Sequence, residues 1–293
     1  MKVFYSPDFV GAAHGFDTTR KAGWVADSLT SNPYSGLTLT EPTPLAESDL
    51  LRVHSEDYVD AVRTGKPAQL AETQGFSWDP ALWHMVLASN GGVVAAAHAA
   101  LTGGVSGSLS SGLHHAKREH GSGFCTFNGL VIAAKKLLDE GAAQSVMILD
   151  LDAHCGGGTA ELVNNDERIE HVDVSVSAFD RYTDTDNSRL RIVHDADDYL
   201  TTVRDMLNAA GQHSLCLYNA GMDPHEDCAI GGLNGITNDI LAQREKLVFD
   251  WCRAHETPVA FVLAGGYIGS RLDQADLVAA HRLTIAEATR SHL

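Results

Sequence analysis

The hydrophobic positions of this chain follow two alternating patterns. Short runs that are apolar at nearly every position, as expected for strands covered on both faces, occur at 2–5, 145–151, 172–176, 214–219 and 258–264. Between them, apolar residues recur with the spacing of amphipathic helices at about 81–101, 130–140, 197–210 and 238–255. Strands alternating with helices are typical of a parallel sheet. The pattern therefore predicts an α/β fold, with a mostly parallel β-sheet flanked by helices on both faces.

The rest of the chain indicates one domain. The segments at about 18–48 and 178–187 are polar, and we expect long loops there. No internal repeat, low-complexity tract or linker-like stretch divides the sequence. A chain of 293 residues is long enough for two domains of ~150 residues, but one large α/β domain fits equally well. We therefore expect a single domain over 1–293.

The charge balance narrows the choice of partners. Lys and Arg number 21 against 38 Asp and Glu, a formal net charge of −17. Nucleic acids and anionic membranes both attract basic clusters, so we expect no nucleic acid and no membrane as partner. The N-terminal residues do not resemble a signal peptide, and no apolar run approaches the ~20 residues that span a bilayer. A cationic or neutral substrate is compatible with this charge.

The cysteines are odd in number and scattered, without a C-x-x-C pair. This usage argues against a disulfide framework and against a thiolate zinc site, and it favours a cytoplasmic location. The five are Cys125, Cys155, Cys216, Cys228 and Cys252.

Residues that carry chemistry follow three of the predicted strands. In open α/β sheets, sites form at the carboxyl ends of the strands. The first end reads Asp150-Leu-Asp152-Ala-His154, where two-residue alternation lets the polar side chains face one side. Asp223 follows the next strand, and Tyr267 follows two glycines after the last. Two carboxylates and a histidine from two strand ends would form a three-ligand metal site with an open position, which is typical of catalytic zinc.

Each motif also has a plain structural interpretation. A D-x-D-x-H run can be a hydrogen-bonded strand end, the Asp223-Pro pair favours a turn, and Tyr267 can simply pack against a loop. Short motifs carry a real false-positive risk. It is their joint occurrence at separate strand ends that favours a metal site.

Two adjacent histidines, His114 and His115, add to this constellation. In a loop both side chains can point into one cleft, whereas on a helix they would diverge by about 100°. A neutral imidazole beside a metal-activated water is a good general base, and a hydrogen-bonded aspartate fixes its tautomer. We expect the pair to lie in the site.

Five motifs follow one another along the chain: Gly-Leu-His114-His115-Ala, Gly123-Phe124-Cys-Thr-Phe-Asn128, Asp150-Leu-Asp152-Ala-His154, Asn219-Ala-Gly-Met-Asp223 and Gly265-Gly266-Tyr267. In order and spacing they resemble the histone deacetylase superfamily, which also includes acetylpolyamine amidohydrolases and acetoin-utilisation proteins on the arginase–deacetylase fold. The likeness runs over nearly the whole chain, and it is closest to the small class IV-like bacterial deacetylases.

The resemblance implies roles for the catalytic residues. It makes Asp152, His154 and Asp223 the ligands of a zinc ion (Zn²⁺). His114 and His115 would be the tandem acid/base and electrostatic pair, with Asp150 orienting His114. Tyr267 would hydrogen-bond the scissile carbonyl and the oxyanion that develops on it.

The resemblance also implies two further sites. Gly123 and Phe124 would line the tunnel that holds the acyl-lysine chain. A structural potassium (K⁺) site would use Asp150, Asp152 and His154 together with strand atoms near Ser175 and Val176.

One position departs from the family pattern. After the zinc histidine most members have His-Gly-Asp-Gly, where the aspartate supports the second tandem histidine, but this chain has Cys155-Gly156-Gly157-Gly158. We therefore expect His115 to lack a carboxylate partner. Losing that partner should lower the pKa of the imidazole. His115 would still act as a base, and its proton donation to the leaving amine would be the weakened step.

These observations predict a zinc-dependent amide hydrolase that removes an acyl group, acetyl or longer, from an acylated amine. The simplest substrate is an N-ε-acyl-lysine peptide or protein. Zinc would activate water and polarise the carbonyl, although iron (Fe²⁺) fits similar donors. An acetylpolyamine amidohydrolase, acting on an acylated small amine, is the main alternative. A non-catalytic acyl-lysine or metal-binding module is a second alternative, favoured by Gly157. The sequence leaves the oligomeric state open.

Overall fold

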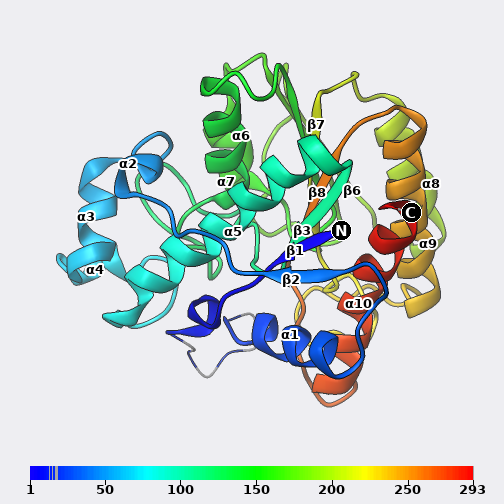
Figure 1. Cartoon of the computed structure of the whole chain (residues 1–293), viewed down its shortest axis with the longest axis horizontal. Helices are drawn as coiled ribbons and strands as arrows, with labels where there is room; N and C mark the ends of the chain where they lie inside the picture. The colour runs from blue at the N-terminus through cyan, green and yellow to red at the C-terminus, as the bar shows by residue number, and fades with distance from the viewer. Residues whose placement is uncertain (13, 15, 17–18, 293) are drawn as a thin grey trace.

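The computed structural model describes residues 1–12, 14, 16 and 19–292 of the chain, built around one parallel sheet. Eight strands lie in the order β2-β1-β3-β8-β7-β4-β5-β6, and every neighbouring pair is parallel (Figure 1). The strands are β1 (Lys2–Phe4), β2 (Thr38–Thr40), β3 (Val105–Ser108), β4 (Val146–Asp150), β5 (Ile169–Ser175), β6 (Ser188–Ile192), β7 (Leu215–Ala220) and β8 (Val259–Leu263).

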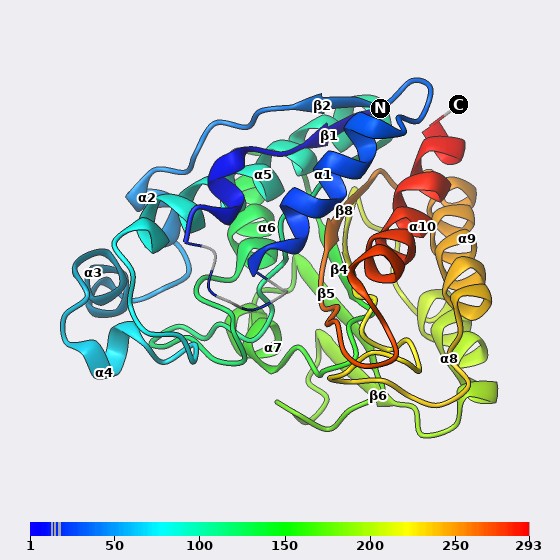
Figure 2. The ribbon, with the colours of Figure 1, turned by 90° about the horizontal axis from the view of Figure 1, so that it is seen from below.

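Helices cover both faces of this sheet. Figure 2 shows α5 and α6 on one side and α8, α9 and α10 on the other, while α2, α3 and α4 form a lobe at the left of Figure 1. The helices are η1 (Pro7–Val10, a 3₁₀ turn), α1 (Lys21–Ser31), α2 (Glu47–Leu50), α3 (Glu56–Thr64), α4 (Ala68–Ala71), α5 (Ala81–Gly103), α6 (Gly129–Asp139), α7 (Gly157–Val163), α8 (Ala196–Asn208), α9 (Asn238–Ala254) and α10 (Gln274–His292).

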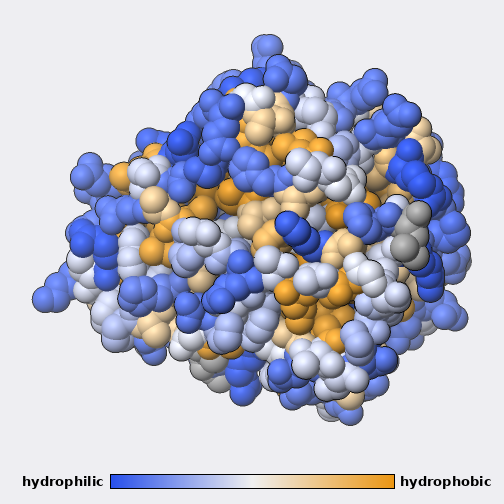
Figure 3. Space-filling view, in the orientation of Figure 1, coloured by the Kyte–Doolittle hydropathy of each residue, from blue (hydrophilic) through white to orange (hydrophobic). Residues whose placement is uncertain are grey.

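The alternation of strand side chains divides the hydrophobic core in two. On β4, Ile148 packs with the residues of α5 and α6, whereas Met147 and Leu149 pack with those of α8, α9 and α10. Successive side chains of a strand point to opposite faces, so each central strand contributes to both cores. This burial on both faces explains why the central strands are apolar at nearly every position. The surface in the view of Figure 3 is mainly hydrophilic, with hydrophobic residues in its recesses.

The predicted fold class is confirmed, and the elements with strong patterns lie where we expected them. The correction concerns the segment 18–48, whose first residue, Thr18, lies outside the described residues. It contains α1 and the edge strand β2. The helix buries Val25, Ala26 and Leu29 at helical spacing and packs against α10. Its glycine, serine and threonine residues lower its intrinsic helix propensity, so tertiary packing stabilises it.

Other elements escaped prediction because polar or small residues occupy their buried positions. The helix α10 buries His281 and Thr284 among its apolar residues, which interrupts the helical pattern. The strand β3 is Val-Ser-Gly-Ser, and the ring of Phe261 on β8 fills the space that a side chain at Gly107 would need. The edge strand β6 carries two arginines. The segment 178–187, by contrast, has no helix or strand, as predicted.

Helix α5 corrects one further expectation. By length and composition alone it is apolar enough to cross a membrane, and it is the one such helix among the described residues. However, 61% of its most apolar window is buried, and it packs on β3, β8 and α6. It therefore occupies the place of a core helix, and a core helix passes the same test.

Candidate metal-dependent active site

The structure brings the predicted strand-end residues to one edge of the sheet. The strands β3, β8, β7 and β4 are neighbours and run parallel, so their carboxyl ends meet there. Asp150 is the last residue of β4. Asp223 and Tyr267 lie shortly after β7 and β8, and the histidine pair lies in the loop after β3.

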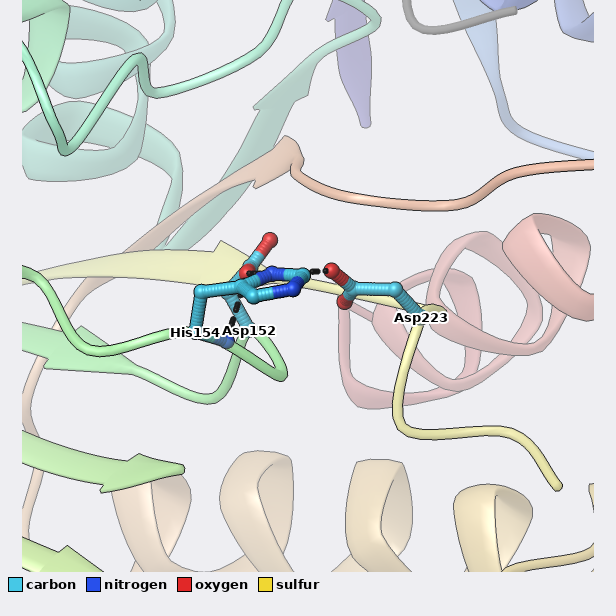
Figure 4. A group of neighbouring side chains, drawn as sticks. All are labelled: Asp152, His154 and Asp223. Atoms are coloured by element: carbon cyan, nitrogen blue, oxygen red, sulfur yellow. Dashed lines mark hydrogen bonds and ion pairs between the residues drawn. The ribbon is translucent and has the colours of Figure 1, made fainter. Parts of the chain in front are cut away.

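Three of these residues form a group that could hold a metal ion. Asp152, His154 and Asp223 each offer one ligand atom, and these atoms lie within 4.8 Å of one another (Figure 4). All three residues are buried. His154 Nδ1 lies 3.1 Å from Asp152 Oδ1 and 3.1 Å from Asp223 Oδ2. The two carboxylates and one imidazole are the donor types that bind zinc in catalytic sites.

Backbone amides hold the two ligand carboxylates in place. The amide of Gly265 donates to Asp152 Oδ2 at 2.6 Å, and the amide of Ala153 donates to Asp223 Oδ1 at 3.0 Å. A Cβ atom at Gly265 would lie 2.6 Å from Asp152 Oδ2 and even closer to Asp223. Glycine at this position therefore lets the backbone approach the ligands, which gives the Gly265-Gly266-Tyr267 motif a physical reason.

The electrostatics of the group favour a cation. Burial and the negative charge of Asp152 raise the pKa of Asp223 to about 6. Burial opposes a charge on His154, but Asp152 and Asp223 outweigh it and raise the pKa of His154 to about 10. Two carboxylates removed from water repel each other unless positive charge lies between them. A divalent cation bound at this group would supply that charge.

Both histidines of the pair lie in a loop and are buried, with ring centroids 4.0 Å apart. His114 Nδ1 lies 2.7 Å from Asp150 Oδ2. The other oxygen of Asp150 accepts a hydrogen bond from Asn219 Nδ2 at 2.8 Å. Asp150 is thus fixed on both sides, and it can orient the imidazole of His114 as the resemblance implies.

The two histidines differ in charge because their surroundings differ. Burial opposes protonation of His114, but Asp150 and Asp152 outweigh it and raise the pKa of His114 to about 10. Burial and the positive charge of His114 lower the pKa of His115 to about 4. His114 is therefore the charged member, and His115 is the neutral one that can accept a proton.

The expectation that His115 lacks a carboxylate partner is wrong. His115 Nδ1 lies 3.0 Å from Asp180 Oδ2. Asp180 belongs to the irregular segment after β5, far along the chain from the position where the family pattern has its aspartate. Asp180 could not be identified from the sequence, because only the folded chain brings it to His115. The one available signal was the missing carboxylate at Gly157.

Tyr267 and the predicted tunnel residues line one cavity of about 360 Å³. Gly123 and Phe124 form part of its wall, and Phe179 and Ile230 are its exposed apolar residues. Burial and the nearby carboxylates raise the pKa of Tyr267 well above its usual range, so its hydroxyl is a donor at neutral pH. The full lining is His115, Gly123, Phe124, His154, Ser177, Phe179, Ile230, Gly231 and Tyr267.

The potassium site stays a prediction. Ser175 ends β5 next to β4, and its hydroxyl donates to Asp173 Oδ1 at 2.6 Å. The amide of Val176 donates to the carbonyl of Ala153 at 3.0 Å. Asp173, which the sequence analysis did not single out, is buried beside Asp150, and burial together with the charge of Asp150 raises its pKa well above its usual range.

This fold and site define a deacetylase-type hydrolase, and comparison with known proteins agrees. The chain matches the histone deacetylase domain family over residues 14–282, and it belongs to this family. It is 28% identical over 288 residues to histone deacetylase 2 of Arabidopsis thaliana, covering 91% of this chain and 73% of that protein. An uncharacterised protein of Picosynechococcus is 34% identical over 224 residues, covering 73% of this chain and 74% of the relative.

Solved structures show the same fold at lower identity. The HD domain of HDA15 superposes with a TM-score of 0.80 at 19% identity, covering 99% of this chain and 89% of that one. An acetylpolyamine aminohydrolase from Burkholderia pseudomallei gives a TM-score of 0.75 at 18% identity, covering 98% of both chains. The predicted arginase–deacetylase-like fold is thereby confirmed.

Proposed function

We propose that this protein is a zinc-dependent deacylase that removes the acyl group from N-ε-acyl-lysine in a peptide or protein. The observation that carries the proposal is that His115, His154 and Tyr267 line one cavity together with the apolar side chains of Phe124, Phe179 and Ile230. Amide hydrolysis needs an activated water, a stabilised oxyanion and a protonated leaving amine. The site offers a residue for each requirement.

The residues present fit a divalent metal. Asp223 Oδ2 is buried and forms an ion pair with His154, but it accepts no hydrogen bond from any other group in the described part of the chain. Asp152, His154 and Asp223 would hold the ion and leave a coordination position open. When bound, the metal supplies a Lewis acid that activates water and polarises the substrate carbonyl. Zinc is our choice for a mixed carboxylate and imidazole shell, and iron(II) accepts the same donors.

Proton transfer falls to the neutral histidine. His115 lines the cavity, and burial with the charge of His114 keeps its pKa low, so its free ring nitrogen can take a proton from the attacking water. The same atom then returns a proton to the leaving amine. His114, charged and held by Asp150, contributes a positive charge beside the reacting centre.

Tyr267 provides the donor for the oxyanion. Its phenol is buried and its raised pKa keeps the hydroxyl protonated. A donor aimed at the oxygen that becomes negative is worth ~3 kcal/mol in the transition state.

The wall of the cavity favours an alkyl chain over a polycation. Phe124 and Phe179 are on its wall, and none of its described lining residues is a carboxylate. Removing the four methylenes of lysine from water is favourable, whereas the ammonium groups of a polyamine would lose their hydration without a carboxylate to replace it. The alternative, an acetylpolyamine substrate, is favoured by the net charge of −17 and by the fold shared with an acetylpolyamine aminohydrolase.

The test is a substrate panel combined with metal analysis on the same sample. Lysine peptides with acetyl to myristoyl groups are compared with acetylated polyamines, and we expect the highest kcat/KM on an acyl-lysine peptide. Asp223→Ala should lose both the metal and the activity, and Asp198→Ala, an exposed aspartate on α8, should keep both. Preference for acetylpolyamines would select the alternative, and full activity of Asp223→Ala would refute the proposed site.

A further inference from the structure

We propose that Asp180 is the positioning residue of His115, and that glycine at position 157 is what makes room for it. The inference rests on the proposed function, because it assigns a task to His115 in that reaction. In the pattern that the chain resembles, the carboxylate comes from position 157, within the same motif as the metal histidine. Here the carboxylate comes from a different segment, and it reaches the same imidazole nitrogen, His115 Nδ1, at 3.0 Å.

Asp180 is held firmly enough to position its neighbour. Its Oδ2 accepts hydrogen bonds from His115 and from the amide of Gly158 at 3.2 Å. Its Oδ1 lies 3.1 Å from Lys117 Nζ, and its side chain is only 10% exposed. Both carboxylate oxygens are therefore occupied, so the carboxylate has one orientation. A histidine pinned by such a partner keeps a fixed ring orientation and a fixed tautomer.

Position 157 and Asp180 compete for the same space. A Cβ atom built on Gly157 would lie 2.5 Å from Asp180 Oδ1 and closer still to the Asp180 backbone oxygen. A Cβ atom does not approach another heavy atom to within about 3 Å, so Asp180 would have to move. Because one of the two contacts is with the Asp180 backbone, a change of side-chain rotamer would not relieve it. Gly157 itself starts helix α7 without a positive φ, so the requirement here is space. Any side chain at 157, aspartate included, would displace the carboxylate that replaces it.

The backbone of Asp180 supports the same conclusion. Its φ is 57°, in the left-handed region that side chains other than those of Asn and Asp rarely adopt. The preceding residue, Phe179, accepts a hydrogen bond from the amide of Cys155 at 3.0 Å. This bond ties the segment to the turn that follows the metal histidine. The local conformation thus directs the Asp180 side chain back toward His115.

The consequence for catalysis is a symmetric pair of supported histidines. Asp150 holds His114, and Asp180 holds His115. With Nδ1–H donated to Asp180, the lone pair of His115 lies on Nε2, which is left free for the substrate in a residue that lines the cavity. An asparagine at 180 can offer its amide N–H to Nδ1 and so favour the opposite tautomer, which removes the base from the cavity.

The experiment compares Asp180→Asn with Asp184→Asn in the metal-loaded enzyme. Asp184 lies on the same segment and bonds Arg191, away from the histidines. We expect Asp180→Asn to lower kcat about a hundredfold, with KM and metal content unchanged, and Asp184→Asn to keep kcat. In a His115→Ala background the further change Asp180→Asn should have no effect, because residues that act as a unit are not additive.

A second measurement does not depend on activity. Imidazole ¹⁵N NMR should show His115 as the Nδ1–H tautomer in the wild-type protein and should show that tautomer lost in Asp180→Asn. Unchanged kcat or an unchanged tautomer in Asp180→Asn overturns the inference, and so does an equal loss of kcat in the His115→Ala background. A wild-type protein that hydrolyses no acylated amine refutes the proposed function instead, and the tautomer then still decides the role of Asp180. If Asp180→Asn does not fold, Lys117→Met, which frees one carboxylate oxygen, should lower kcat without changing KM.

Discussion

Adding a single methyl group at position 157 should disable the site without removing any polar group. In Gly157→Ala the new Cβ would lie 2.5 Å from Asp180 Oδ1, whereas carbon contacts are comfortable at ~3.5 Å. The segment around Asp180 must therefore move by about 1 Å. That shift separates the Asp180 carboxylate from His115 Nδ1, now 3.0 Å away, because a hydrogen bond is effectively lost beyond ~3.6 Å.

The magnitude follows from the lost orientation. Losing the general base costs ~10²–10⁴ in rate, and we expect the lower end, about a hundredfold or ~2.7 kcal/mol, because His115 itself remains. Stability should change little. Overpacking costs ~1–3 kcal/mol, while replacing glycine by alanine within a helix returns up to ~1 kcal/mol. The net loss in the free energy of unfolding should be about 2 kcal/mol or less, a shift in Tm of a few degrees.

The assay is steady-state kinetics with metal content and thermal unfolding on the same preparation. The matched control is Gly103→Ala near the end of α5, where a Cβ meets nothing closer than 3.8 Å. This control should keep kcat and should be as stable as the wild-type protein or more so. Full turnover in Gly157→Ala, or an equal loss in the control, would refute the steric argument.

Three further predictions concern other parts of the molecule. Tyr267→Phe should lower kcat about a hundredfold with metal content intact, measured by kinetics and elemental analysis. Arg244→Met should lower the free energy of unfolding by ~3–5 kcal/mol in denaturant melts. The fully buried guanidinium donates to the Leu151 carbonyl and forms an ion pair with the buried carboxylate of Glu245, and its loss leaves that carboxylate without its cationic partner. His54 is kept neutral, mainly by burial, with its pKa lowered from 6.5 to about 4, and its Nε2 accepts from the Asn128 amide. Because the unfolded chain protonates His54 more readily than the folded one, the free energy of unfolding should fall by ~3 kcal/mol as the pH drops from 6.5 to 4. Melts of His54→Gln should lose that part of the pH dependence.

Each of these three predictions has a result that would contradict it. Tyr267→Phe with unchanged kcat would remove the phenol from catalysis. Arg244→Met with wild-type stability would show that the ion network around this residue contributes nothing net. An identical pH dependence in His54→Gln would mean that other groups dominate acid unfolding. The exposed variant Asp198→Ala is the common control for expression and folding.

The parts of the fold that depend on local pattern were predictable, and the parts that depend on distant partners were not. Strand β4 is apolar at nearly every position and helix α5 is predominantly apolar, and the structure has both within a few residues of the predicted bounds. Helix α1 depends on its contacts with α10, which no local window contains. The metal group was predictable because its three residues follow strand ends that the topology gathers at one edge. Asp180 follows no strand end directly, and its role depends on the course of an irregular segment.

The mutual exclusion between a side chain at 157 and the carboxylate of Asp180 also has a consequence for comparing related sequences. The two carboxylates cannot both support His115, because the Gly157 position has no room while the Asp180 segment lies where it does. Glycine at 157 and aspartate at 180 are therefore one linked feature of this chain. A change of residue at 157 alone would not restore the family arrangement, because the segment around 180 would also have to take another path.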